Sequence, residues 1–199
     1  MSSKKINIPP AERCMRLMSH MGMLEHIIAH SLKVCRVALF LTDRLGLPGL
    51  NRELIRAAAL LHDITKTRSF RTLEDNAETG ARLLNDLGYP EVAKIVGQHV
   101  RLNSYVRTSP SLTDAQIVNY SDKRVLHDRI VPLSTRMGYI LEKYGSNPEQ
   151  RKKILLLLTE TQRLEERLFG RLSFSPDDLS GLLSAGSASP VFPSLPDNG

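Results

Sequence analysis

The chain has 199 residues, a length that suits a single domain with a core of its own. Hydrophobic residues make up 41% and charged residues 24% of it, and no apolar run approaches the roughly 18–20 residues that span a bilayer. The net charge of +6 favours an anionic partner, either a phosphorylated small molecule or a nucleic acid. Aromatic residues reach only 5% and tryptophan is absent, which argues against a protein that stacks single-stranded bases.

The cysteines and the N-terminus indicate where the protein works. Cys14 and Cys35 do not form a close pair in the sequence, so two reduced thiols are expected. Residues 1–10 contain two lysines but no apolar segment behind them, so a secretory signal is not expected there. We therefore expect a cytoplasmic protein without membrane contact.

Helical periodicity runs through most of the chain. A helix is expected up to about Gly46, because the apolar residues before it follow i, i+3, i+7 spacing. Asn51 can cap a second helix over 54–62, which is apolar on most sides and is therefore predicted to be the central buried helix. A third is expected over 76–87, with Gly88 as its stop.

Helices also dominate the second half of the predicted fold. Pro90 opens one helix, and Thr113 and Gln116 form a capping box that starts the helix carrying Asp122. Two more are expected over 132–144 and 148–170, and Ser175-Pro176 resembles a further helix start. Strand pairs, repeats and hairpin signals are not apparent, residues 68–75 are expected to be a polar connector, and residues 185–199 a disordered tail.

The dipeptide His62-Asp63 is the most informative feature of the sequence. It ends an apolar run, with His30 upstream and His99 and Asp122 downstream. An imidazole and a carboxylate are costly to place at the end of a buried helix. A metal ion satisfies both directly, because intermediate divalent metals accept these two ligands.

Asp122 is expected to belong to the same site. It shares a helical face with Val118 and Val125, which should be buried, and an unpaired carboxylate there would be strongly destabilising. Lys123 and Arg124 are alternative partners, but adjacent residues on a helix do not face each other. A metal is therefore the better partner.

The ordered set of histidines and aspartates, in a helical context, resembles the HD-domain metal-dependent phosphohydrolases over about residues 23–145. Supporting segments are 30–34, 59–66, 80–81, 87–90, 98–99 and 122–123. The resemblance implies an all-α fold, a compact HD-type helical bundle around a metal site. The expected divisions are an N-terminal segment and helix (1–22), the HD core (23–146), C-terminal helices (147–184) and the tail (185–199).

The resemblance also implies the ligand set and the metal. A divalent ion, chosen among Fe, Mn, Co, Ni and Zn, would be held by His30, His62, Asp63 and Asp122. Many two-metal relatives carry a histidine four residues before the glycine that corresponds to Gly80. That position is Asn76 here, and an amide oxygen is a poor ligand for these metals, so one metal per chain is expected.

Catalytic and substrate-binding roles follow from the same resemblance. Asp63 would ligate the metal and orient a water, Lys66 would bind a phosphate oxygen, and His99 would bind substrate or pass a proton. A satisfied core histidine remains an alternative for His99, and a solvated surface lysine for Lys66. Arg68, Arg101 and Lys123 are further candidates for binding the negative charge of the substrate. The second His-Asp dipeptide, His127-Asp128, is assigned no role.

The implied function is hydrolysis of a phosphate ester or anhydride by metal-activated water, with a nucleotide as the expected substrate. The alternative is a non-catalytic HD-type regulatory or ligand-binding module. An RNA-binding role is a third hypothesis, but the basic residues are scattered, so nucleic acid is not the expected partner. The leucine run 155–158 supports either a homodimer or a packing helix.

Overall fold

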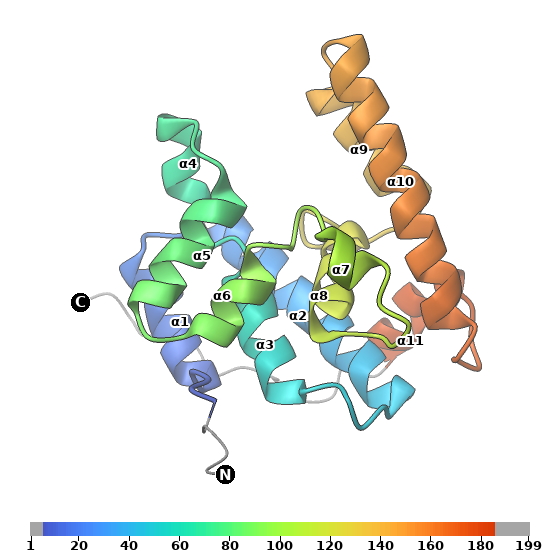
Figure 1. The fold of residues 1–199 in the computed structure, drawn as a ribbon, viewed down its shortest axis with the longest axis horizontal. Helices are drawn as coiled ribbons and strands as arrows, with labels where there is room; N and C mark the ends of the chain where they lie inside the picture. Colours follow the sequence, from blue (N-terminus) through green and yellow to red (C-terminus); the bar gives the residue numbers. More distant parts are fainter. Residues whose placement is uncertain (1–5, 186–199) are drawn as a thin grey trace.

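A computed structural model describes residues 6–185 and is almost entirely helical, which confirms the predicted all-α class (Figure 1). The helices are α1 (Ala11–His20), α2 (Glu25–Leu45), α3 (Arg52–Leu61), α4 (Lys66–Thr72), α5 (Asn76–Asp86), α6 (Pro90–Val96), α7 (Ser104–Arg107), α8 (Asp114–Lys123), α9 (Leu133–Tyr144), α10 (Pro148–Phe169) and α11 (Leu179–Ala185). A single 3₁₀ turn, η1 (Pro176–Asp178), precedes α11 within the described residues.

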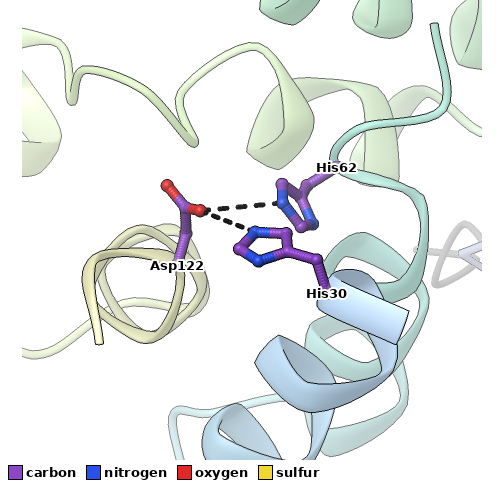
Figure 2. Close-up of side chains that lie close together, drawn as sticks. All are labelled: His30, His62 and Asp122. Atoms are coloured by element: carbon purple, nitrogen blue, oxygen red, sulfur yellow. Dashed lines mark hydrogen bonds and ion pairs between the residues drawn. The ribbon is translucent and has the colours of Figure 1, made fainter. Parts of the chain in front are cut away.

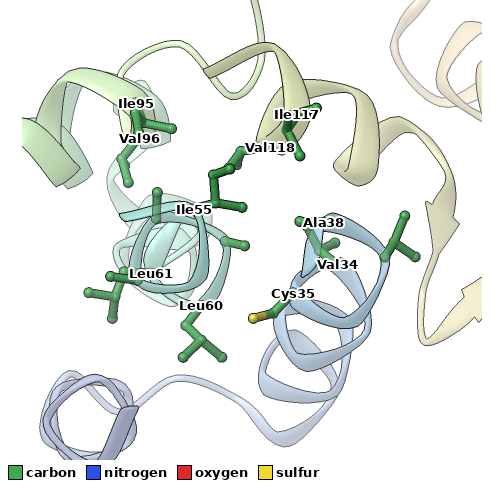
Figure 3. Close-up of a cluster of buried hydrophobic side chains, with 14 of the residues drawn as sticks. Val34, Cys35, Ala38, Ile55, Leu60, Leu61, Ile95, Val96, Ile117 and Val118 are labelled. Carbon is green, nitrogen blue, oxygen red and sulfur yellow. The ribbon is translucent and has the colours of Figure 1, made fainter. Parts of the chain in front are cut away.

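The core forms around α3, which packs against α1, α2, α6 and α8. The five residues from Ala57 to Leu61 are all fully buried, as the all-round apolar pattern predicted. Figure 3 shows apolar side chains of α6 and α8, such as Val96 and Val118, next to α3, with Val34 and Ala38 of α2 in the same cluster. Each buried aliphatic side chain of this size contributes about 1.5–3 kcal/mol, so this cluster fixes the ends of the helices that carry the site.

The predicted caps and stops are present. Asn51 accepts the Leu54 N–H at 3.1 Å, and Thr113 and Gln116 make the reciprocal bonds of a capping box. Gly46 and Gly88 end α2 and α5 with φ of 58° and 82°, in the left-handed region that glycine adopts without strain.

Two local predictions were wrong. A small antiparallel hairpin joins β1 (Val125–Leu126) to β2 (Arg129–Ile130) through His127-Asp128, where no strand was expected. The stretch 68–75 is not a simple connector, because α4 occupies most of it. Both elements are too short for a hydrophobic period to reveal them.

The C-terminal helices α9 and α10 pack together and extend away from the helical body (Figure 1). Thr161, Leu164 and Leu168 anchor the second half of α10, whereas Leu155 and Leu156 are 50% and 55% exposed. The predicted tail over 185–199 begins at the last residue of α11, and 186–199 lie outside the described residues. Among the described helices, none combines the length and apolarity required to cross a membrane.

Candidate metal centre

Three helices bring His30, His62 and Asp122 together (Figure 2). Asp122 Oδ1 lies 3.1 Å from His30 Nε2 and 3.8 Å from His62 Nε2. One ligand atom from each residue falls within 4.8 Å of the other two, and all three residues are buried. His62 caps the C-terminal end of α3 and Asp122 is the penultimate residue of α8. His30 lies in the second turn of α2.

The three histidines of the predicted set are oriented in the same way. In each ring, Nδ1 lies close to a backbone carbonyl oxygen. The distance is 2.7 Å from His30 to His127, 2.9 Å from His62 to Ala59 and 2.7 Å from His99 to Val96. A carbonyl oxygen can only accept, so in each ring Nδ1 carries the proton and donates it. The neutral form of each ring therefore presents the lone pair of Nε2, as metal-ligating histidines with a backbone second shell do.

His62 provides the clearest test of whether a cation fits. Its side chain is fully buried, and among the described residues its Nε2 atom has no hydrogen-bond partner. Burial lowers the pKa of His62 to about 4, because the charged imidazolium cannot be solvated there. A buried, neutral nitrogen lone pair that faces a carboxylate suits a divalent metal.

Asp63 lies at the edge of this trio. Its Oδ2 is 3.6 Å from His62 Nε2, and its Oδ1 is 3.5 Å from His99 Nε2 and 3.9 Å from Lys66 Nζ. Burial would raise the pKa of Asp63, but His62, His99 and Lys66 together hold it below the ordinary value. The carboxylate is thus ionised and able to serve as a ligand or as a proton acceptor.

Asn76 is held away from a ligand role. Its Nδ2 donates to Asp63 Oδ1 at 2.6 Å, and its Oδ1 accepts from the Thr65 hydroxyl at 3.0 Å. The carboxylate can only accept, so the amide turns its donor, and not its oxygen, toward the site. That the chain binds one metal stays a prediction.

The contacts of Asp122 contradict the inference that Lys123 cannot be its partner. Lys123 was dismissed as its partner because adjacent helical residues diverge, yet Lys123 Nζ lies 3.2 Å from Asp122 Oδ2. Lys123 is 2% exposed and also donates to the His99 carbonyl oxygen. Arg136 Nη2 is 3.8 Å from Asp122 Oδ1. Burial opposes ionisation, but Lys123, His30 and Arg136 keep the pKa of Asp122 well below its ordinary value.

His99 lies in the turn just after α6. It is 3% exposed, and its ring packs edge-on against His62 with the centroids 5.0 Å apart. Because its Nε2 faces Asp63, His99 lies close enough to the trio for a role in the site.

A pocket of about 210 Å³ opens beside these residues. His30, Asp63 and Lys66 line it together with Arg136 and Lys143 of α9, so cations surround the mouth of the metal centre. Of the four predicted substrate-binding residues, Lys66 alone lines the pocket. Arg68 pairs with Glu74 at 3.2 Å, Arg101 is exposed outside the pocket lining, and Lys123 is buried behind Asp122.

Sequence reasoning missed two contributors. Arg136 comes from a helix beyond the motif, and nothing in its local sequence distinguishes it from a surface arginine. His127 contributes its backbone carbonyl, which orients His30, although the residue had been assigned no role. A backbone acceptor leaves no signal in residue type.

The chain is similar to a curated protein and to one family model. It is 28% identical over 145 residues to the tRNA (cytidine(56)-2'-O)-methyltransferase of Picrophilus torridus, a match that covers 65% of this chain and 40% of the relative. The chain thus spans less than half of that relative's length. No solved structure matches it. The HD domain family model matches residues 27–125, which include His30, His62, Asp63, His99 and Asp122. Together with the all-α fold, this match shows that the chain belongs to the HD-domain superfamily.

Proposed function

We propose that the protein is a metal-dependent phosphohydrolase that cleaves a phosphate ester or anhydride. One observation supports this most directly: the Nε2 atom of His62, buried and without a hydrogen-bond partner among the described residues, faces Asp122 beside a pocket lined by cations. If His62 were only a buried core residue, the adjoining pocket lined by Lys66, Arg136 and Lys143 would have no explanation.

The residues fit a metal held by His30, His62 and Asp122, with Asp63 as the adjacent fourth ligand. A bound divalent ion would supply a water of lowered pKa and charge stabilisation for phosphoryl oxygens. Asp63 would orient that water through its free carboxylate lone pairs. Lys66 and Arg136 would bind the phosphoryl oxygens, because both line the pocket and lie within 4 Å of Asp63 and Asp122 respectively.

His99 is proposed to assist Asp63. Its Nδ1 proton is held by the Val96 carbonyl oxygen, so its Nε2 lone pair is directed at the Asp63 carboxylate 3.5 Å away. A proton taken up by Asp63 from the attacking water would pass to the His99 lone pair, and His99 would return it to the oxygen that leaves phosphorus.

A small phosphorylated molecule, preferably a nucleotide, is the proposed substrate. The overall charge of +6 and the cationic mouth of the pocket both favour an anion. The similar methyltransferase acts, by its name, on tRNA, so RNA carrying a terminal phosphate belongs in any substrate panel beside free nucleotides.

The test is elemental analysis of the purified protein, followed by phosphate release from this panel with each of Mn, Fe, Co, Ni and Zn. We expect about one bound metal per chain, and turnover that Asp63→Ala abolishes. Asp43→Ala is the matched control, because Asp43 is an exposed aspartate that pairs with Arg52 on the surface. Bound metal without turnover on any substrate would favour the regulatory module. Failure to bind any supplied metal would overturn the proposal.

A further inference from the structure

Helix α4 stands on one side of the pocket without serving the core. All seven of its residues are described, and none of them is buried. Lys66, at its start, lies 3.9 Å from Asp63, and Phe70, one turn later, lines the same pocket while remaining 55% exposed. A helix that buries nothing gains little from packing, so its pocket-facing residues call for another explanation.

Helix α9 repeats this arrangement from the opposite wall. Arg136 reaches to within 3.8 Å of Asp122, and Tyr139, Lys143 and Tyr144 follow it along the pocket. The Tyr139 ring is covered from several sides, because it packs edge-on against His127 with the ring centroids 5.6 Å apart and has Arg136 and Lys143 over it. Tyr144 is 49% exposed and has the Lys143 ammonium over its ring.

Both walls therefore present a cation next to the metal centre and an aromatic ring farther along the helix. Phe70 follows Lys66 by four residues, which is about 6 Å along a helix axis and keeps both on one face. Arg136 and Lys143 are seven residues apart, or two turns, and so also share a face. Among the described residues that line the pocket, Asp63 is the one carboxylate, so an anion meets little repulsion.

We infer that Phe70 and Tyr144 form a base-binding clamp that makes the site selective for phosphates attached to a planar aromatic group, that is, for nucleotides over sugar phosphates. The inference rests on the proposed function and adds the residues that determine specificity. The phosphate would lie against Lys66 and Arg136, and the base between the two exposed rings. Stacking on an aromatic side chain is tolerant of base identity, so the clamp selects for a base without choosing among bases.

The test compares nucleoside 5′-monophosphates with ribose 5-phosphate, which has the same phosphate and sugar but no base. In the metal-loaded wild-type protein, kcat/KM for nucleotides is expected to exceed that for ribose 5-phosphate by tenfold or more, the size of one stacking interaction. Phe70→Ala and Tyr144→Ala should each reduce this ratio at least fivefold, mainly through KM. Phe70→Tyr should preserve it, because the ring remains.

Tyr105→Ala is the matched control, because Tyr105 is 83% exposed on α7 and does not line the pocket. It should leave the ratio unchanged. A ratio that is near one in the wild type, or that survives both alanine substitutions, would overturn the clamp. A ratio that Phe70→Tyr destroys as fully as Phe70→Ala would also overturn it, because a ring would then not be the requirement.

Binding of hydrolysis-resistant phosphonate analogues, measured by calorimetry, separates this inference from the proposed function. Base-dependent binding that Phe70→Ala abolishes, in a protein that hydrolyses nothing, would support the clamp and reject the phosphohydrolase. Turnover of nucleotides and ribose 5-phosphate at equal efficiency would support the phosphohydrolase and reject the clamp.

Discussion

At the level of single residues, the Asp122 carboxylate is balanced by the buried cation Lys123 as well as by His30. Lys123 is 2% exposed, and burial lowers its pKa although the Asp122 carboxylate opposes that shift. Asp122→Asn would leave this ammonium without its carboxylate in a dry environment. We expect it to reduce the free energy of unfolding of the metal-free protein by about 3–5 kcal/mol, measured by urea denaturation in the presence of a chelator.

The double variant Asp122→Asn/Lys123→Met tests whether the unpaired Lys123 ammonium causes this loss of stability. Removing the stranded charge together with its partner should restore at least half of the lost stability, because an apolar side chain of similar length is easier to bury. Losses that simply add in the double variant would show that the two side chains do not depend on each other.

The same residues illustrate what the sequence could predict. His30, His62, Asp63 and Asp122 were found because chemically unusual residues stood in an ordered helical context, and the structure gathers His30, His62 and Asp122 with Asp63 beside them. The Asp122–Lys123 contact was rejected on helix geometry. That geometry describes Cβ directions, whereas a flexible lysine at the last position of α8 can bend back along the helix end.

At the level of elements, the β1–β2 hairpin orients the proposed metal ligand His30 through its backbone. His127 occupies the left-handed region with φ of 56°, and its carbonyl oxygen accepts the Nδ1 proton of His30. His127→Pro cannot adopt this φ and should displace the carbonyl, lowering metal affinity about 10–100-fold with little change in helix content. Chelator competition and circular dichroism provide the two measurements.

His127→Asn is the companion variant, because asparagine tolerates the left-handed region and keeps the same backbone carbonyl. It should bind metal within a few-fold of the wild type. If His127→Asn weakened binding as strongly as His127→Pro, the imidazole and not the backbone would be responsible.

Long elements with strong end signals were predictable and short ones were not. Asn51, Thr113 and Gly88 marked helix ends correctly because each acts through its own local chemistry. Helix α4 buries none of its side chains, so it carries no apolar stripe to detect, and two-residue strands are too short to alternate. The two strands pack against α2, and β1 also against α8, and such tertiary contacts decide strand formation more than local sequence does.

At the scale of the whole molecule, Arg124 joins the HD core to the C-terminal helices. This guanidinium is 2% exposed and contacts Tyr120 and Glu165, and it donates to the carbonyl oxygens of Val131 and Pro176. Arg124→Met should remove about 3–5 kcal/mol of unfolding free energy, because these buried acceptors lose their donor.

Arg163→Met is the control for this substitution, because Arg163 is an exposed arginine of α10. It should change stability by no more than about 0.5 kcal/mol. Equal losses in the two variants would mean that any arginine in this part of the chain matters, and that the buried network does not hold the C-terminal helices to the core.

Metal binding should also stabilise the whole fold, because its ligands come from α2, from the end of α3 and from α8, which all pack around one core. An ion present at about 100 times its dissociation constant adds about 2.7 kcal/mol to the folded state. For a chain of this length that corresponds to a rise in Tm of roughly 5–10 °C. A chelator should reverse the rise, and resupplied metal should restore it.

His62→Gln tests whether this stabilisation acts through the proposed centre. Glutamine can still offer an amide donor to the Ala59 carbonyl oxygen that His62 Nδ1 contacts at 2.9 Å, but it lacks the imidazole lone pair. Its Tm should therefore be insensitive to chelator and close to that of the metal-free wild type. If metal raised the Tm of His62→Gln as much as that of the wild type, the stabilising ion would bind elsewhere, and the convergence of His30, His62 and Asp122 would have to be explained without one.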